Sequence, residues 1–95
     1  MALTERFEND KIEVVGTYKA VQVRRAEIIE KDGVEVARSF HRHALQCGTL
    51  NESDELVDTD ISGEDADVQA ICNAAWTDAV KDAYKAYLIA NKPAG

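Results

Sequence analysis

Residues 18–45 have the sequence YKAVQVRRAEIIEKDGVEVARSFHRHAL, and they predict a long β-hairpin. Valine and isoleucine, which favour strands, recur on both sides of the turn signal Lys31-Asp32-Gly33. Gly33 can adopt the positive φ that such a turn requires. The alternation of apolar residues slips at Arg24-Arg25, so we expect a β-bulge there. One apolar face of the hairpin would then contain Val21, Val23, Ala26, Ile28, Val34, Val36 and Phe40.

The segments on either side complete a small α+β fold. Residues 1–10 are expected to form an arm or the start of a short helix, and residues 12–15 a strand that stops at Gly16. The predicted architecture is an antiparallel β-hairpin or three-stranded meander packed against one long C-terminal helix. We expect a single domain over residues 1–95, with the hairpin or meander at 11–47, an acidic loop at 48–61 and the helix at 62–91.

The helix prediction is based on a capping signal and on apolar periodicity. Ser62 is a good N-cap with Asp65 three residues on, and Pro93 would end the element. Apolar residues recur at three- and four-residue steps and form a stripe broader than one hairpin needs. About 28 helical residues match a strand of about 13 residues in length, so the helix is expected to lie along the hairpin. The residues expected in the core or in a subunit interface are Val21, Val23, Phe40, Ile71, Trp76, Val80 and Tyr87.

Composition limits the classes of function. The chain has 95 residues, of which 45% are hydrophobic and 31% charged, and these values are typical of one small globular domain. Its net charge of −7 disfavours nucleic acid as a partner. Cys47 and Cys72 have neither disulfide-framework nor metal-knuckle spacing and predict two reduced thiols. No apolar run resembles a signal peptide or a membrane span, so we expect a protein that is not secreted and has no membrane partner.

The two histidines are weak candidates for binding a metal ion. His41 and His43 point the same way in a strand, and they could join Cys47 or Cys72. A structural zinc site needs three or four converging ligands, and the spacing supplies two. As general bases the histidines would need a nucleophile and an orienting acid, and no serine or cysteine is placed for that role. We therefore predict no catalytic residues and no enzyme activity.

A second weak metal candidate lies in the acidic loop. Asp58 and Asp60 occupy the first and third positions of a segment, residues 58–63, that matches half of a calcium-binding loop. The twelfth position should be glutamate and is Gln69, and no helix precedes the loop. We predict no metal and no cofactor, so a chelator should leave the melting temperature unchanged.

A basic band on the hairpin has two interpretations. It could bind nucleic acid, but aromatic residues are few and the chain is acidic overall. It could instead form ion pairs with glutamates of the hairpin, or with the acidic segment 52–67 of the same or another subunit. The band consists of Arg24, Arg25, Arg38 and Arg42.

Several segments carry a resemblance to a known group of proteins. The sequence resembles small proteins encoded by marine bacteriophages, a group with no assigned catalytic residues to carry over. The resemblance covers most of the chain and implies a viral origin and, by association, a role in a virion or its assembly. The matching segments are KIEVVG at 11–16, YKAVQVRRA at 18–26, ARSFHRH at 37–43, SGEDA at 62–66 and VQAIC at 68–72.

These observations favour a non-enzymatic protein that acts as a self-associating structural or assembly component. The expected partner is the protein itself, as a dimer or higher homo-oligomer, because the helical stripe is broad and the strands lack proline at their edges. The alternative is a phage-encoded module that binds and modulates a host protein. Either role would be performed in the virion or in the host cytoplasm.

Overall fold

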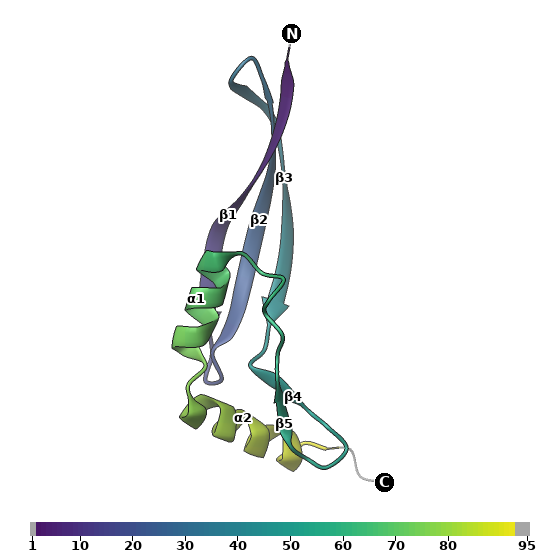
Figure 1. The fold of residues 1–95 in the computed structure, drawn as a ribbon, viewed down its shortest axis with the longest axis vertical. Coiled ribbons are helices and arrows are strands. Elements are labelled where there is room, and N and C mark those ends of the chain that lie inside the picture. The colour runs from purple at the N-terminus through teal and green to yellow at the C-terminus, as the bar shows by residue number, and fades with distance from the viewer. Residues whose placement is uncertain (1, 93–95) are drawn as a thin grey trace.

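A computed structural model describes residues 2–92 and shows an α+β fold built on a three-stranded antiparallel sheet. The strands are β1 (Leu3–Val15), β2 (Ala20–Lys31) and β3 (Val34–Leu45), in the spatial order β1-β2-β3 (Figure 1). Of the two predicted arrangements, the sheet is therefore the three-stranded meander. The expectation of an arm or helix start over residues 1–10 is wrong, because β1 pairs with β2 all the way from Val15 back to Leu3.

The turn between β2 and β3 is the one that the sequence predicts. Lys31 pairs with Val34, so the loop contains only Asp32 and Gly33, with φ of 52° and 82°. Two successive positive φ values are typical of the type I′ turn, whose twist matches that of the flanking strands. The turn between β1 and β2 is longer and spans residues 16–19.

The β-bulge lies in β1 and not at Arg24-Arg25 as expected. The β1–β2 register shifts between Asn9 and Lys11, which leaves Asp10 as the extra residue. The β2–β3 register is unbroken from Val21 to Ile29. Side chains alternate along an unbroken strand, so Val21 and Val23 face one side of the sheet and Ala26 and Ile28 face the other. The single apolar face expected for these residues, together with Val34, Val36 and Phe40, does not form.

Two helices replace the single helix expected over residues 62–91. They are α1 (Ala66–Ala75) and α2 (Asp78–Ala90), and the chain turns at Trp76 and Thr77 between them. Trp76 has φ −91° and ψ 70°, outside the helical region, and the Thr77 hydroxyl accepts a hydrogen bond from the backbone N–H of Val80 as the N-cap of α2.

The helical region also begins later than the sequence predicts. Ser62 is not the N-cap, because the N-cap of α1 is Asp65, three residues later than expected. Pro93, expected to end the element, lies outside the described residues. Figure 1 shows α1 beside the sheet and α2 running crosswise below its end, so no helix follows the full length of the hairpin as we expected.

The predicted acidic loop contains a small second sheet. Its strands are β4 (Gly48–Leu50) and β5 (Leu56–Asp58), joined by a turn at residues 51–55. Gly48 is needed where β4 begins, because a Cβ atom there would lie 2.7 Å from the carbonyl oxygen of Val57. Asn51 Oδ1 closes the turn by accepting hydrogen bonds from the backbone N–H groups of Ser53 and Glu55.

The hydrophobic core cluster lies at one end of the molecule. Fully or nearly fully buried side chains from β2, from α1 and from the residues just before β4 and just after α1 form it, and residues from α2 and the small sheet pack against it. We call this end, with α1, α2, β4, β5 and the adjoining strand ends, the base. The core cluster consists of Val21, Val23, Cys47, Val68, Cys72 and Trp76.

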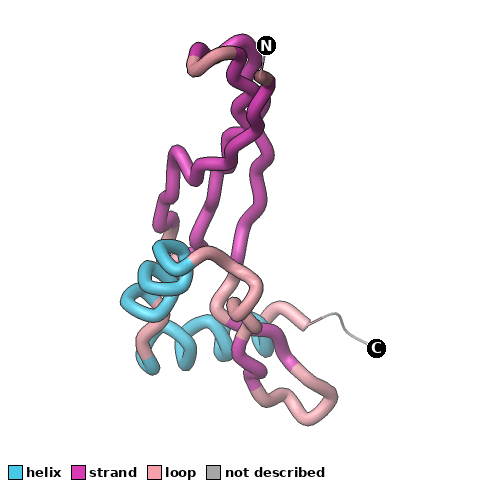
Figure 2. The backbone as a smooth tube through the Cα atoms, turned by 45° about the horizontal axis from the view of Figure 1, so that its top comes forward, coloured by secondary structure: helices cyan, strands magenta, loops and turns pink. Residues whose placement is uncertain are grey.

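The rest of the sheet extends away from the base. The molecule measures 60 × 29 × 21 Å, and its radius of gyration is 17.7 Å. A compact domain of this length would have a radius of gyration of about 12 Å. Figure 2 shows that the three strands continue well beyond the helices, which lie beside the sheet only at the other end. We call this extension the arm and define it as residues 3–9, 26–31 and 34–40. It is part of the three-stranded sheet and differs from the separate N-terminal arm that the sequence led us to expect at residues 1–10.

Candidate interaction surface

The arm exposes large apolar side chains that a small globular protein would normally bury. Leu3 and Val34, at the tip, have 67% and 66% of their surface exposed. Phe7, Val36 and Phe40 are also exposed. Large apolar side chains that remain exposed in one part of a small protein favour a site of protein association there. The arm is therefore the strongest candidate for a functional surface in residues 2–92.

The arm has two faces, and the strand register assigns residues to them. Residues directly opposite one another in neighbouring antiparallel strands point to the same side. The face that continues from Val21 and Val23 is the helix-side face, because α1 covers it in the base. In the arm and next to it, this face contains Phe7, Asn9, Arg25, Glu27, His41 and His43.

Polar contacts tie the helix-side face to the start of α1. Asn9 donates a hydrogen bond from Nδ2 to Asp65 Oδ2 at 2.8 Å. His43 Nε2 lies 2.9 Å from Glu64 Oε1. Further out, the guanidinium of Arg25 lies 4.3 Å from the ring centroid of Phe7, a cation–π contact. The helix cover ends at this point, and the arm beyond it has no layer above the sheet.

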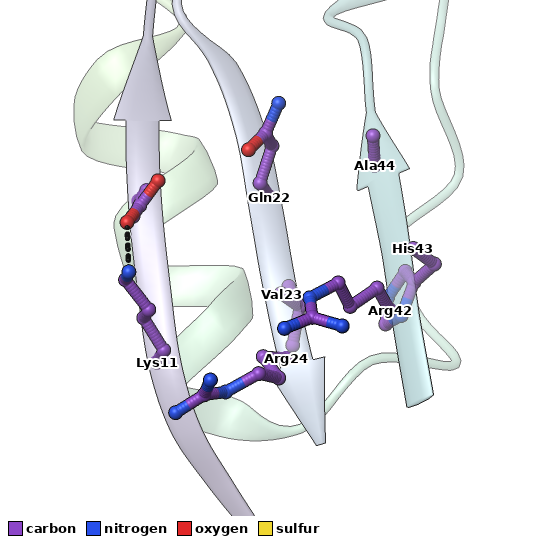
Figure 3. Close-up of a pocket in the computed structure, with 8 residues that line it drawn as sticks. Lys11, Gln22, Val23, Arg24, Arg42, His43 and Ala44 are labelled. Atoms are coloured by element: carbon purple, nitrogen blue, oxygen red, sulfur yellow. Dashed lines mark ion pairs between the residues drawn. The ribbon is translucent and has the colours of Figure 1, made fainter. Parts of the chain in front are cut away.

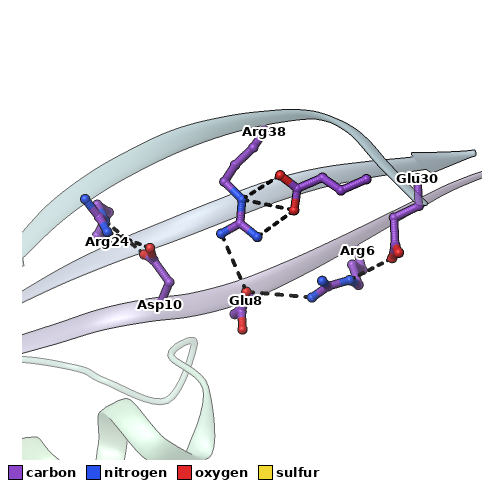
Figure 4. A network of polar contacts seen from close by, with 7 residues as sticks. Arg6, Glu8, Asp10, Arg24, Glu30 and Arg38 are labelled. Atoms are coloured by element: carbon purple, nitrogen blue, oxygen red, sulfur yellow. Dashed lines mark hydrogen bonds and ion pairs between the residues drawn. The ribbon is translucent and has the colours of Figure 1, made fainter. Parts of the chain in front are cut away.

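The opposite face, which we call the open face, carries a network of ion pairs (Figure 4). Arg6 Nε donates to Glu30 at 2.8 Å, and Arg38 Nη2 donates to Glu35 at 2.7 Å. Glu8 lies between the two arginines, 3.7 Å from Arg6 and 3.9 Å from Arg38.

This network also buries apolar residues of the arm. Ile28, opposite both Arg6 and Arg38 in the register, is fully buried, and so is Ala26. The aliphatic stems of the two arginines therefore cover Ile28 while their charged ends meet carboxylates. On the open face, arginine stems thus cover Ala26 and Ile28, which the sequence predicted to share one apolar face with Val21 and Val23.

The bulge residue Asp10 joins the same network. Arg24 donates from Nε and Nη2 to the two carboxylate oxygens at 3.0 and 2.7 Å. The hydrogen bond from Arg24 is the largest cause of a lowered pKa at Asp10, and the hydrogen bond from Arg38 likewise lowers the pKa of Glu35. A lowered pKa in the folded state means that these ion pairs stabilise the fold above the ordinary carboxyl pKa, and that this stabilisation is lost as the pH falls through the lowered values.

A shallow hollow of about 370 Å³ lies on the open face behind the core (Figure 3). Lys11, Arg24 and Arg42 line it, but Lys11 pairs with Glu13 at 2.8 Å and Arg24 pairs with Asp10. The cations are therefore largely neutralised within the chain. Of the predicted basic band, Arg24, Arg38 and Arg42 share the open face, whereas Arg25 lies on the other face.

The four weak metal candidates do not converge. His41 lies 3.2 Å from Glu27, and His43 contacts Glu64. Asp58 forms an ion pair with Lys81, and Asp60 accepts a hydrogen bond from the backbone N–H of Ser62 at 2.9 Å, with its pKa lowered by the hydrogen bonds from Ser62. Within residues 2–92, no three histidine, cysteine, aspartate or glutamate side chains are grouped as metal ligands would be.

The residues expected in the core or an interface divide into two groups. Val21, Val23 and Trp76 are buried in the core cluster, and Ile71 and Val80 pack against it. Trp76 also donates a hydrogen bond from Nε1 to the carbonyl oxygen of Lys19 at 2.8 Å.

The second group is exposed in the single chain. Phe40 and Tyr87 have 43% and 45% of their surface exposed. They are therefore not core residues, and their place in an interface stays a prediction. Tyr87 instead packs against the partly buried Tyr18 and Tyr84, with ring centroids 5.0 to 6.2 Å apart.

The two cysteines are free and fully buried in the core. Burial raises the pKa of both the Cys47 and the Cys72 thiols above the ordinary value of 9.0. A thiol that stays protonated and enclosed is a poor nucleophile. Their role in the described structure is packing.

Sequence reasoning missed Leu3 and Phe7 as surface residues, because it did not place residues 1–10 in a strand. The sequence does contain a signal for a strand there, because the segment that includes Phe7 and leads into Lys11 has no glycine or proline. Such a segment can continue the strand predicted at residues 12–15. The charges of Glu5, Arg6 and Glu8 hid it, although charged side chains are common on edge strands.

No protein-family model, curated protein or solved structure matches this chain. Neither helix in residues 2–92 combines the length and the apolar character that a membrane crossing requires. The geometry alone therefore bears on function. It offers an extended, three-stranded arm with two open edges and exposed apolar side chains, attached to a small base.

Proposed function

We propose that this protein is a non-enzymatic, self-associating structural or assembly component of the kind that a bacteriophage encodes. The observation that carries the proposal is the arm, whose apolar tip residues Leu3 and Val34 and aromatic residues Phe7 and Phe40 are exposed. Association between copies would bury this surface and satisfy the open strand edges. Such a component would act in a virion or in the cytoplasm of a host cell.

The chemistry of the reactive side chains supports a role without catalysis. His41 and His43 are each within hydrogen-bond distance of a glutamate on the sheet or in the loop before α1, and both cysteines are enclosed in the core. A nucleophile needs an adjacent base and access to a substrate. Neither thiol has that access in the described structure.

The test is the mass of the protein in solution. Multi-angle light scattering after size exclusion, at micromolar concentration, is expected to give a dimer or a larger homo-oligomer of the 10.5 kDa chain. A variant with the β1 residues Leu3 and Phe7 both changed to serine should associate more weakly than the parent. A monomer at high concentration would contradict the proposal. The arm would then be expected to bind a different protein, such as a protein of the host.

A further inference from the structure

We propose that two copies associate through the β1 edges of their arms, in an antiparallel pair centred on Phe7. This inference deepens the proposed function by naming the surface through which the protein self-associates. The two edges of the sheet are β1 and β3, since the order is β1-β2-β3. Each edge strand presents backbone N–H and C=O groups that can pair with another chain.

The two edge strands differ in the pattern of their charged residues. Along β1, Arg6 and Glu8 flank Phe7, so two antiparallel copies centred on Phe7 place Arg6 of each opposite Glu8 of the other. The same register sets Glu5 opposite Asn9 and Thr4 opposite Asp10, so no like charges face one another. Opposite charges on directly opposed residues stabilise an antiparallel pair, whereas like charges destabilise it.

The β3 edge lacks this self-complementarity. Its second half carries Arg38, His41, Arg42 and His43 and contains no acidic residue. A pair of β3 strands centred on Phe40 would place Arg38 opposite Arg42 at two positions. Charge therefore favours β1 as the edge that meets a second copy.

The backbone of β1 fits the same register. The regular part of the strand ends at Asn9, because the bulge at Asp10 interrupts the ladder. Pairing over residues 5–9 is symmetric about Phe7 and stays within the regular part. A bulge at this point also limits how far a second strand can pair, which favours a closed pair over continued extension.

The position of the base leaves room for this pairing. The core and both helices lie at the Val15 end of β1, and the arm lies at the Leu3 end (Figure 1). In an antiparallel pair centred on Phe7, the two bases point away from each other. The result is a six-stranded sheet across the dimer, with the exposed ring of Phe7 next to its counterpart at the twofold axis.

Charge reversal tests the register. At about 150 mM salt, Arg6→Glu and Glu8→Arg should each weaken dimerisation by roughly tenfold or more, because each sets like charges opposite one another at two places. The double variant Arg6→Glu/Glu8→Arg should restore the dissociation constant to within about threefold of the parent. The matched control Arg42→Glu, on the β3 edge, should leave it unchanged. Sedimentation velocity measures the constants, and circular dichroism verifies that each variant is folded.

Cross-linking tests the same geometry without changing the charges. Phe7→Cys places two thiols opposite each other at the twofold axis, and mild oxidation should give a covalent dimer on a non-reducing gel. The control His41→Cys, also exposed but on β3, should stay monomeric on that gel. Cys47 and Cys72 are buried, so they do not compete in the folded protein.

The outcomes distinguish this inference from the proposed function. A native dimer that is insensitive to both charge reversals and gives no Phe7→Cys link would overturn the β1 pairing and leave self-association standing. Masses that grow with concentration without reaching a limit would show β1 pairing with β3 of the next copy, and would also overturn it. A native monomer would overturn both proposals together.

Discussion

At the scale of single residues, Trp76 joins three parts of the base. Its ring is 7% exposed and packs in the core cluster with Val68 and Cys72 of α1, and its Nε1 donates to the Lys19 carbonyl oxygen in the β1–β2 turn. It also occupies the break between α1 and α2. One side chain therefore holds the helices against the sheet.

We expect Trp76→Ala to lower the free energy of unfolding by about 3–5 kcal/mol, because it leaves a large cavity. That is a large fraction of the roughly 5–15 kcal/mol that stabilises a small domain. Urea denaturation measures it, and the emission of this single tryptophan should be blue-shifted in the folded state and move red on unfolding. Phe40→Ala, in the arm, should cost much less. Native emission typical of water-exposed indole, with an unchanged midpoint, would contradict the burial of Trp76.

At the scale of elements, the cap of α2 explains why the helical region divides. Apolar periodicity continues through Trp76, so it does not reveal the break. Thr77 supplies a hydroxyl that accepts from the Val80 N–H at 3.3 Å, and Asp78 follows in the first turn, where a negative charge suits the helix dipole. The break at Trp76 costs helical hydrogen bonds. The N-cap at Thr77 and the burial of the Trp76 indole compensate for this loss.

Thr77→Ala should destabilise the protein by about 1 kcal/mol, since it removes the only side-chain cap found at the start of either helix. Ser62→Ala is the matched control, because Ser62 is exposed and does not cap α1, and it should change stability by less than about 0.5 kcal/mol. Thermal and urea unfolding measure both variants. A larger loss for Ser62→Ala than for Thr77→Ala would show that helix formation starts at Ser62 after all.

At the scale of the whole molecule, burial is uneven. The base holds the core cluster, whereas the arm depends on its strand hydrogen bonds, on the arginine network over Ile28 and on the Arg25–Phe7 contact. Regions with few buried apolar contacts open more readily. Hydrogen exchange should therefore be faster in the arm than in the β2 residues beneath α1, unless association between arms protects them.

The whole molecule should also be stable without a bound metal ion. Within the described residues, neither the His41–His43 pair nor the Asp58–Asp60 pair belongs to a group of three or more side chains that could hold a metal ion. Adding EDTA should leave the melting temperature unchanged within about a degree. A fall of several degrees that zinc or calcium reverses would show that a metal ion binds the folded state.

The sequence alone determined the features that depend on near neighbours. Asp32-Gly33 predicted the β2–β3 turn because turn chemistry is local, and the α+β class followed from a strand period before the acidic segment and a helical period after it. Val21, Val23 and Trp76 were identified as core because large apolar side chains with the right spacing have few alternatives to burial.

Only the tertiary structure decided the features that depend on distant partners. The bulge lies at Asp10 because Arg24, fourteen residues away, holds its carboxylate there, and so Ala26 and Ile28 turn away from Val21 and Val23. The helical region breaks where burying Trp76 against the β1–β2 turn outweighs a continuous helix. The arm stays uncovered because the helices pack over the core at one end, and no local pattern states how far along a sheet a helix will reach.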